Sequence, residues 1–256
     1  MLIWLMLATA FEFLVPTGNA GGMIAGGAVA DWQNLFLQNP ALIMEAERFQ
    51  AGLAYSRPYG LDCVDWGRIC AVVRKERWGS GVGFGSLSFG NYRESDLQLN
   101  FGVEPIKQVK AGLGMHLMAV DIGRYGVDVV PAFDLGFAWQ AGVFRLGAAG
   151  FRTNLPRFRN GDELPGRFVL AGAMRPVETL VLALDLSREG GKESAAFGMD
   201  FRLVPPLELR IGVGYEPLLY AAGFGIRVGV FKIDYAYRFH PQLKETHIFG
   251  MQAAWH

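Results

Sequence analysis

Residues 230–256, VFKIDYAYRFHPQLKETHIFGMQAAWH, contain two short segments in which apolar and polar side chains alternate. In the first segment every second position is large and apolar or aromatic, and charged residues or alanine lie between: Phe231, Ile233, Tyr235 and Tyr237 against Lys232, Asp234, Ala236 and Arg238. A β-strand points successive side chains to opposite faces, so this segment predicts a strand with one apolar and one polar face.

The second segment repeats the pattern after a polar turn. Phe249, Met251, Ala253 and Trp255 share one face, and the sequence ends one residue later. A final amphipathic strand ending in an aromatic residue is typical of transmembrane β-barrels, whose apolar face meets lipid and whose polar face lines the lumen. We therefore predict an all-β, antiparallel up-and-down barrel, with Phe249, Met251 and Trp255 as the signal read by the barrel-assembly machinery.

The composition fits a barrel in contact with lipid. The 256 residues are 51% hydrophobic and 19% charged with zero net charge, and the mean hydropathy is +0.21. Beyond the N-terminus no run is long and apolar enough for a membrane helix, so the hydrophobicity is spread over short alternating segments. The neutral balance gives no reason to expect nucleic-acid binding. A soluble β-sandwich also alternates and is the alternative fold.

Residues 1–20, MLIWLMLATAFEFLVPTGNA, resemble a secretory signal peptide, with an apolar core followed by the small residues Gly18 and Ala20. The segment lacks a basic start and carries Glu12, and a membrane-anchoring helix is the alternative. Export and the barrel pattern together predict the outer membrane of a diderm bacterium, with its lipid as a partner.

Residues 21–47 show no strand alternation, and the pair Asn39-Pro40 marks a chain break. We predict a helical or irregular segment that plugs the barrel mouth, with Asn39, Pro40 and Ala41 as the candidate plug motif. The alternative is a partly ordered leader whose Asn-Pro turn only ends a helix.

Residues 48–256 form the predicted barrel domain, with about fourteen strands. The first twelve are expected at 48–57, 67–77, 79–89, 92–103, 107–120, 127–140, 143–153, 167–175, 178–188, 192–203, 206–215 and 219–229, and the last two in the stretch quoted above. Apolar residues in 79–89 change face between Phe84 and Leu87, which predicts a β-bulge. The predicted connections are short at one end of the barrel and longer at the other, the asymmetry of outer-membrane barrels.

The inward positions carry charges of both signs. They are Asp96, Lys110, His116, Asp128, Asp134, Arg145, Arg167, Asp185, Asp200, Arg202, Glu208, Arg210, Arg227, Lys232, Asp234 and Arg238. They either line a water-filled pore or pair across a closed interior. On these facings, an outward Leu182→Arg should destabilise the barrel by ~2–4 kcal/mol, whereas Asp185→Ala should be mild.

Catalytic and metal chemistry lack sequence support. GxSxG is absent, no Ser or Cys stands in a recognisable nucleophile context, and no metal-site spacing occurs, so we predict neither an enzyme nor a cofactor. Cys63 and Cys70 are the two cysteines, and in an exported chain they predict a disulfide that closes a small loop.

Three motifs resemble the PorV/PorQ branch of the FadL-like outer-membrane proteins. They are AVADWQNLFLQNPALI (28–43), SFGNYRE (88–94), and DYAY (234–237) followed by His240, Leu243, Thr246 and His247. Lys244 stands where the family usually has glycine, and His256 follows the final aromatic residue.

The resemblance implies an outer-membrane barrel whose N-terminal segment enters the lumen. PorV-like members bind exported proteins for the type IX secretion system, so secretion subunits or exported proteins are implied partners. FadL-like members carry hydrophobic small molecules through a hatch and a lateral opening. The motifs favour a PorV-like, secretion-associated barrel; the alternatives are a FadL-like transporter and a structural barrel without transport.

Overall fold

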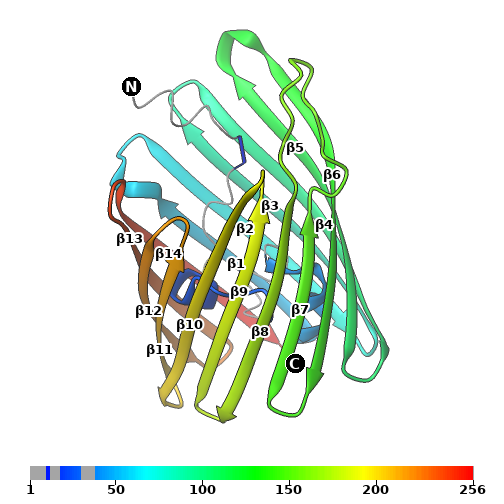
Figure 1. The fold of residues 1–256 in the computed structure, drawn as a ribbon, viewed down its shortest axis with the longest axis vertical. Coiled ribbons are helices and arrows are strands. Elements are labelled where there is room, and N and C mark those ends of the chain that lie inside the picture. Colours follow the sequence, from blue (N-terminus) through cyan, green and yellow to red (C-terminus); the bar gives the residue numbers. More distant parts are fainter. Residues whose placement is uncertain (1–9, 12–17, 30–37, 256) are drawn as a thin grey trace.

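The computed structural model, which describes residues 10–11, 18–29 and 38–255, forms one closed barrel of antiparallel strands (Figure 1). Each strand pairs with its neighbours in sequence, and β1 closes the barrel on β14. The strands are β1 (Phe49–Arg57), β2 (Val64–Lys75), β3 (Trp78–Phe89), β4 (Tyr92–Ile106), β5 (Val109–Ile122), β6 (Val127–Ala141), β7 (Phe144–Phe151), β8 (Arg167–Val177), β9 (Leu180–Glu189), β10 (Lys192–Val204), β11 (Leu207–Tyr215), β12 (Leu219–Val228), β13 (Phe231–His240) and β14 (Lys244–Trp255).

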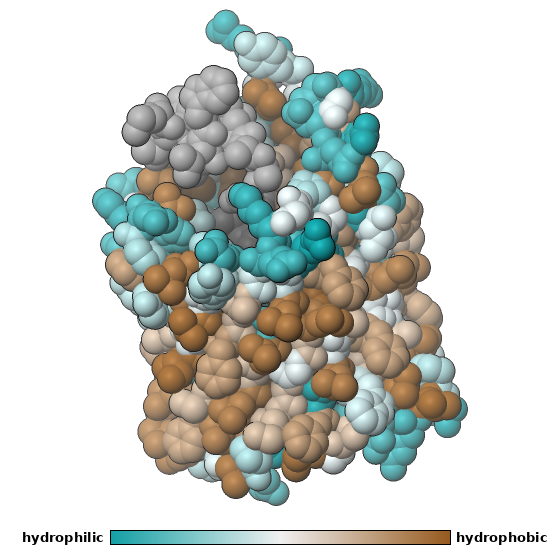
Figure 2. Space-filling model, in the orientation of Figure 1, coloured by the Kyte–Doolittle hydropathy of each residue, from teal (hydrophilic) through white to brown (hydrophobic). Residues whose placement is uncertain are grey.

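The fourteen predicted strands are confirmed, because each alternating segment of the sequence forms one strand of the barrel. The largest differences in bounds are at β2, which begins at Val64, and at β4, which continues to Ile106. Large apolar side chains such as Leu99, Leu135 and Ile211 are about half exposed on the outside of the barrel. Figure 2 shows them as a hydrophobic band over the strands, with hydrophilic residues gathered toward the ends. A water-soluble sandwich would bury this surface, whereas a membrane barrel turns it to lipid.

The two ends of the barrel differ in their connections. At one end, here called the inner end, consecutive strands are joined by two residues each, at 76–77, 107–108, 142–143, 178–179, 205–206 and 229–230. The opposite, outer end carries longer connections at 58–63, 123–126 and 152–166, the first two including the short helices η3 (Pro58–Gly60) and η4 (Gly123–Tyr125). Short turns face the periplasm in outer-membrane barrels, so we expect the outer end to be the extracellular one.

The predicted bulge in β3 is wrong. β3 keeps one register with β2 and with β4 from Trp78 to Phe89. Leu87 points inward and is buried against Val64 and Trp66, so the change of face reflects an apolar interior rather than an extra residue. Register shifts occur instead next to inner turns, as between Val103 and Ile106.

The predicted disulfide is also wrong, because no bond joins Cys63 and Cys70. Cys63 lies in the connection before β2, and Cys70 lies within that strand. At about 3.3 Å per residue the strand separates the two Cα atoms by roughly 20 Å, whereas a disulfide needs them within about 7 Å.

The N-terminal segment enters the barrel. Its described residues include two short helices, α2 (Gly18–Met23) and the 3₁₀ helix η2 (Pro40–Glu45). α2 packs against β10–β13, and η2 packs against β3–β6 on the opposite wall, so the segment crosses the interior (Figure 1). Of the predicted signal peptide, residues 1–9 and 12–17 lie outside the described residues. Within the described ranges, none of the helices has the length and apolar character to cross a membrane.

Candidate functional site: the N-terminal segment inside the lumen

The first half of the N-terminal segment is held by a carboxylate on the barrel wall. The backbone N–H groups of Gly26 and Gly27 donate to the same oxygen, Oδ2 of Asp185 on β9, at 2.7 and 2.9 Å. Asp185 and both glycines are buried. The Nε of Arg238, on β13, donates to the Gly21 carbonyl at 2.8 Å. The wall therefore binds the backbone of this part of the segment, and the side chains of Met23, Ala25, Ala28 and Val29 pack in one cluster with apolar wall residues.

Asn39 joins the two halves of the segment to each other and to the wall. Its Nδ2 donates to the Gly27 carbonyl at 3.2 Å and to the Phe137 carbonyl of β6 at 2.9 Å. Its Oδ1 accepts from the Ala41 N–H at 3.0 Å and caps η2, which begins at Pro40. Asn39 and Ala41 are 0% exposed. The predicted plug motif thus lies in the interior, at the start of η2.

Glycines in the wall make room for this segment. A Cβ at Gly136 would lie 2.3 Å from Asn39 Oδ1, and one at Gly212 would lie 2.2 Å from the Met23 carbonyl oxygen. Real Cβ contacts are essentially never below 3.0 Å, so these wall positions accept only glycine while the plug is seated. The same close approach occurs at Gly112, Gly147 and Gly198.

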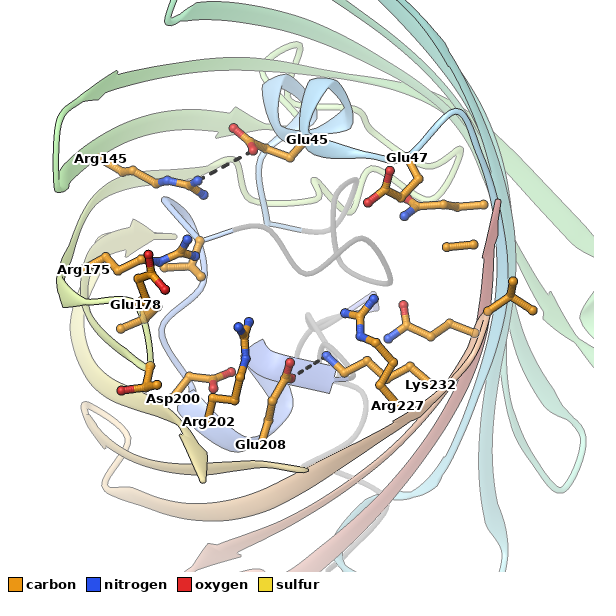
Figure 3. Close-up of a pocket in the computed structure, with 17 residues that line it drawn as sticks. Glu45, Glu47, Arg145, Arg175, Glu178, Asp200, Arg202, Glu208, Arg227 and Lys232 are labelled. Carbon is orange, nitrogen blue, oxygen red and sulfur yellow. Dashed lines mark ion pairs between the residues drawn. The ribbon is translucent and has the colours of Figure 1, made fainter. Parts of the chain in front are cut away.

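Below the plug, a cavity of about 220 Å³ opens at the inner end (Figure 3). Its polar wall carries acidic and basic groups from many strands, and Val29, Glu45 and Glu47 of the N-terminal segment line it too. The Glu45 carboxylate forms an ion pair with Lys110 and lies 3.8 Å from Arg145.

A buried guanidinium organises one side of this cavity. The Arg210 side chain is 0% exposed, and its nitrogens bind three carboxylates: Asp200 at 3.0 Å, Glu208 at 2.5 Å and Asp234 at 2.5 Å. Lys232 Nζ lies 2.7 Å from Glu208 as a second cation. The sequence placed all five residues on inward positions, and the structure brings them together.

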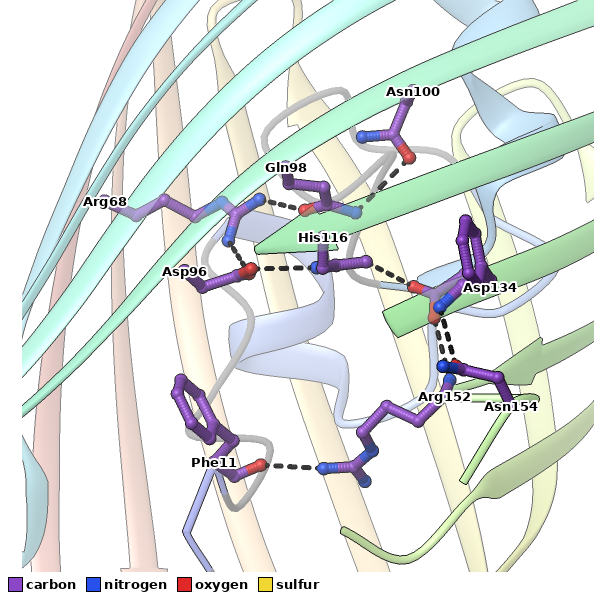
Figure 4. Close-up of polar contacts among 10 residues, drawn as sticks. Phe11, Arg68, Asp96, Gln98, Asn100, His116, Asp134, Arg152 and Asn154 are labelled. Carbon is purple, nitrogen blue, oxygen red and sulfur yellow. Dashed lines mark hydrogen bonds and ion pairs between the residues drawn. The ribbon is translucent and has the colours of Figure 1, made fainter. Parts of the chain in front are cut away.

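A second polar network crosses the lumen on β2–β6 (Figure 4). His116 Nδ1 lies 2.9 Å from Asp96, and its Nε2 lies 2.7 Å from Asp134. Asp96 also faces Arg68 at 3.7 Å, and Arg68 binds Gln98. The charged groups of this layer therefore have partners on other strands, with Arg68 of β2 reaching across β3 to β4.

Among the described residues, the outer half of the lumen contains two clusters of buried apolar side chains, which the sequence analysis missed. One comprises Met118, Val120, Val130, Ala132, Phe158 and Leu164, with Ala10, Phe11 and Tyr92 packed against it. The other comprises Ala54, Val64, Trp66 and Leu87. One residue in the sequence could have indicated these clusters: Leu87 is apolar although it occupies an inward-facing position of β3.

The remaining predicted residues take other places. Asp128 accepts from the Arg159 N–H of the 152–166 connection at 2.6 Å, and Arg202 and Arg227 line the inner cavity. Phe249, Met251 and Trp255 lie exposed on the outer face. Within the described part of the chain, no group of three or more His, Cys, Asp or Glu is placed to hold a metal ion.

Comparison with known proteins gives a fold but no sequence family. No protein-family model and no curated protein match the chain. Among solved structures, the CymD monoaromatic hydrocarbon channel matches with a TM-score of 0.75 at 14% identity, over 96% of this chain and 99% of that one. The Pseudomonas putida toluene transporter TodX matches with a TM-score of 0.72 at 12% identity, over 96% and 100%. A Pseudomonas aeruginosa FadL homologue matches with a TM-score of 0.69 at 12% identity, over 94% and 98%.

The chain therefore has the fold of FadL-type outer-membrane barrels. Of the three, CymD is named as a channel and TodX as a transporter.

Proposed function

We propose that this protein is an outer-membrane channel that admits small hydrophobic molecules, with its N-terminal segment as an internal plug. The observation that carries the proposal is the pair of apolar clusters in the outer half of the lumen, on β1–β3, β5, β6 and the 152–166 connection. A general porin keeps a polar, water-filled lumen, whereas apolar walls favour apolar ligands.

The solved structures support the same class of ligand. CymD is described as a monoaromatic hydrocarbon channel and TodX as a toluene transporter. Because their identity to this chain is 12–14%, they supply the fold, and the ligand class rests on the lining described above.

The secretion-associated function that the sequence motifs favoured receives no support from these structures. The residues that resemble PorV and PorQ are also spread apart. Residues 88–94 form the outer turn between β3 and β4, whereas Asp234 binds Arg210 in the lumen. A type IX role, with secretion subunits or exported proteins as partners, stays a prediction.

The test is uptake of labelled toluene by diderm bacteria that express the protein. We expect faster uptake than in cells with an empty vector. Ala132→Trp should abolish the faster uptake, because Ala132 is 0% exposed within the apolar cluster in the outer half of the lumen. The matched control is Phe133→Trp, at the next residue, which lies on the lipid face of β6. This variant should keep the faster uptake.

Two outcomes contradict the proposal. In one, toluene uptake is unchanged although heat-modifiable gel migration shows that the cells contain folded barrel. This result would mean that the protein does not transport toluene. An equal gain for glucose shows an unselective pore.

A further inference from the structure

Three arginines occupy equivalent positions in three alternate strands at the inner end. Arg175 on β8, Arg202 on β10 and Arg227 on β12 each donate their backbone N–H to a residue of the preceding inner turn, Val143, Thr179 and Pro206 respectively. This shared geometry sets the three residues at the same level around the mouth. All three line the cavity of about 220 Å³.

The three guanidinium groups take part in none of the ion pairs formed among the described residues. Figure 3 marks two ion pairs among the lining residues, Arg145–Glu45 and Lys232–Glu208. Among the described residues, no carboxylate lies within ion-pair distance of Arg175, Arg202 or Arg227.

The nearby acids are mostly engaged elsewhere. Asp200 and Glu208 bind the buried Arg210, and Glu45 binds Lys110. Glu47 and Glu178 also line the cavity, so its described lining holds five acidic and five basic side chains, and Arg175, Arg202 and Arg227 are the bases without an ion pair to a described residue. Figure 3 shows the arginine side chains extending from the wall into the open space.

We propose that this cavity is a binding site for a small carboxylate anion at the inner mouth of the barrel. A guanidinium presents a planar fork of N–H donors that matches a carboxylate. A single exposed guanidinium–carboxylate pair is weak, but three groups around one cavity can bind one anion together. The volume suits an anion of the size of benzoate and is small for larger ligands, whose pockets are about 300–1,000 Å³. The site needs no passage through the plug, so it goes beyond the proposed transport function.

The experiment is calorimetric titration of the purified full chain in dodecyl maltoside micelles with benzoate, with empty micelles as reference. Benzyl alcohol is the neutral probe of the same shape. We expect saturable benzoate binding with a Kd of roughly millimolar order, weakened by added salt, and no saturable heat with benzyl alcohol.

Charge-removing variants locate the site. Arg202→Gln combined with Arg227→Gln should weaken benzoate binding about tenfold or more, since each 1.4 kcal/mol corresponds to tenfold. The matched control is Arg93→Gln combined with Arg188→Gln, which removes the same charge from the outer end of β4 and β9 and should leave binding unchanged. Arg202→Lys keeps the charge and serves as a second variant if the double variant does not fold.

Equal heats for benzoate and benzyl alcohol would contradict the proposed anion site. Unchanged benzoate binding in the Arg202→Gln and Arg227→Gln double variant would contradict it as well. Binding in micelles requires no transport. A negative toluene result with positive benzoate binding therefore removes the channel function alone, and the reverse removes the anion site alone.

Discussion

Gly27 and Asp185 are 158 positions apart in the chain, and the Gly27 N–H donates a 2.9 Å hydrogen bond to Asp185 Oδ2 inside the barrel. The same oxygen accepts from Gly26 at 2.7 Å. One carboxylate on β9 thus fixes a turn of the N-terminal segment in the middle of the lumen. Because both donors are backbone groups, the interaction depends on Asp185 and on the close approach that the glycines permit.

Asp185→Ala should release this part of the plug while leaving the barrel folded. Hydrogen bonds to a charged group are worth about 1.5–3 kcal/mol each, so losing two should weaken seating of the plug by about 3 kcal/mol or more. The measurement is ion conductance in planar bilayers, where we expect higher conductance than for the unmodified protein. Asp128→Ala, which removes a carboxylate bound to the outer connection, is the control and should not change it. Wild-type conductance in Asp185→Ala would show that the plug is held without this residue.

Gly136→Ala should displace the plug from the opposite wall. The new Cβ would lie 2.3 Å from Asn39 Oδ1 and 2.6 Å from the Ala41 nitrogen, so the start of η2 must move. Limited proteolysis of the folded barrel should then cut the N-terminal segment at least several-fold faster. Gly172→Ala on β8 is the matched control, because its nearest new contact is at an ordinary 3.9 Å. If the two variants are cut at the same rate, the interior wall tolerates a side chain at Gly136 and the close fit has no consequence.

The strands could be predicted from the sequence because lipid on one side and a polar lumen on the other impose a period of two. The same period predicts which positions face the lumen, but it does not predict which of these side chains contact each other. Arg210 and Asp234 lie 24 positions apart, on β11 and β13, and contact each other across the intervening strand β12. The hydrogen bonds of Asp185 could not be predicted because its partners, Gly26 and Gly27, lie in a segment without periodicity. The apolar clusters of the outer half of the lumen were missed because the period of two predicts polar residues at inward positions, whereas Leu87 is apolar and faces inward.

The depth dependence of the lipid face can be measured at two leucines. Leu184 lies in the middle of β9 and is 48% exposed, whereas Leu203 lies near the inner end of β10 and is 53% exposed. An arginine at the bilayer midplane costs about 2–4 kcal/mol and one near the interface about 0–1. Urea unfolding from lipid vesicles should therefore show a large loss for Leu184→Arg and a small one for Leu203→Arg. Equal losses at both sites would contradict the placement of Leu184 in the middle of the membrane.

Removal of the buried Arg210 guanidinium should destabilise the barrel itself. Arg210→Met keeps much of the side-chain volume but leaves Asp200, Glu208 and Asp234 together without their central cation. Breaking a buried ion pair by removing one partner typically costs about 3–5 kcal/mol, because the remaining charge is uncompensated. We expect a loss of that order in urea unfolding, whereas Arg188→Met, at an exposed arginine of β9, should change little. Stability in Arg210→Met equal to that of Arg188→Met would mean that Lys232, 2.7 Å from Glu208, is enough to balance the three carboxylates.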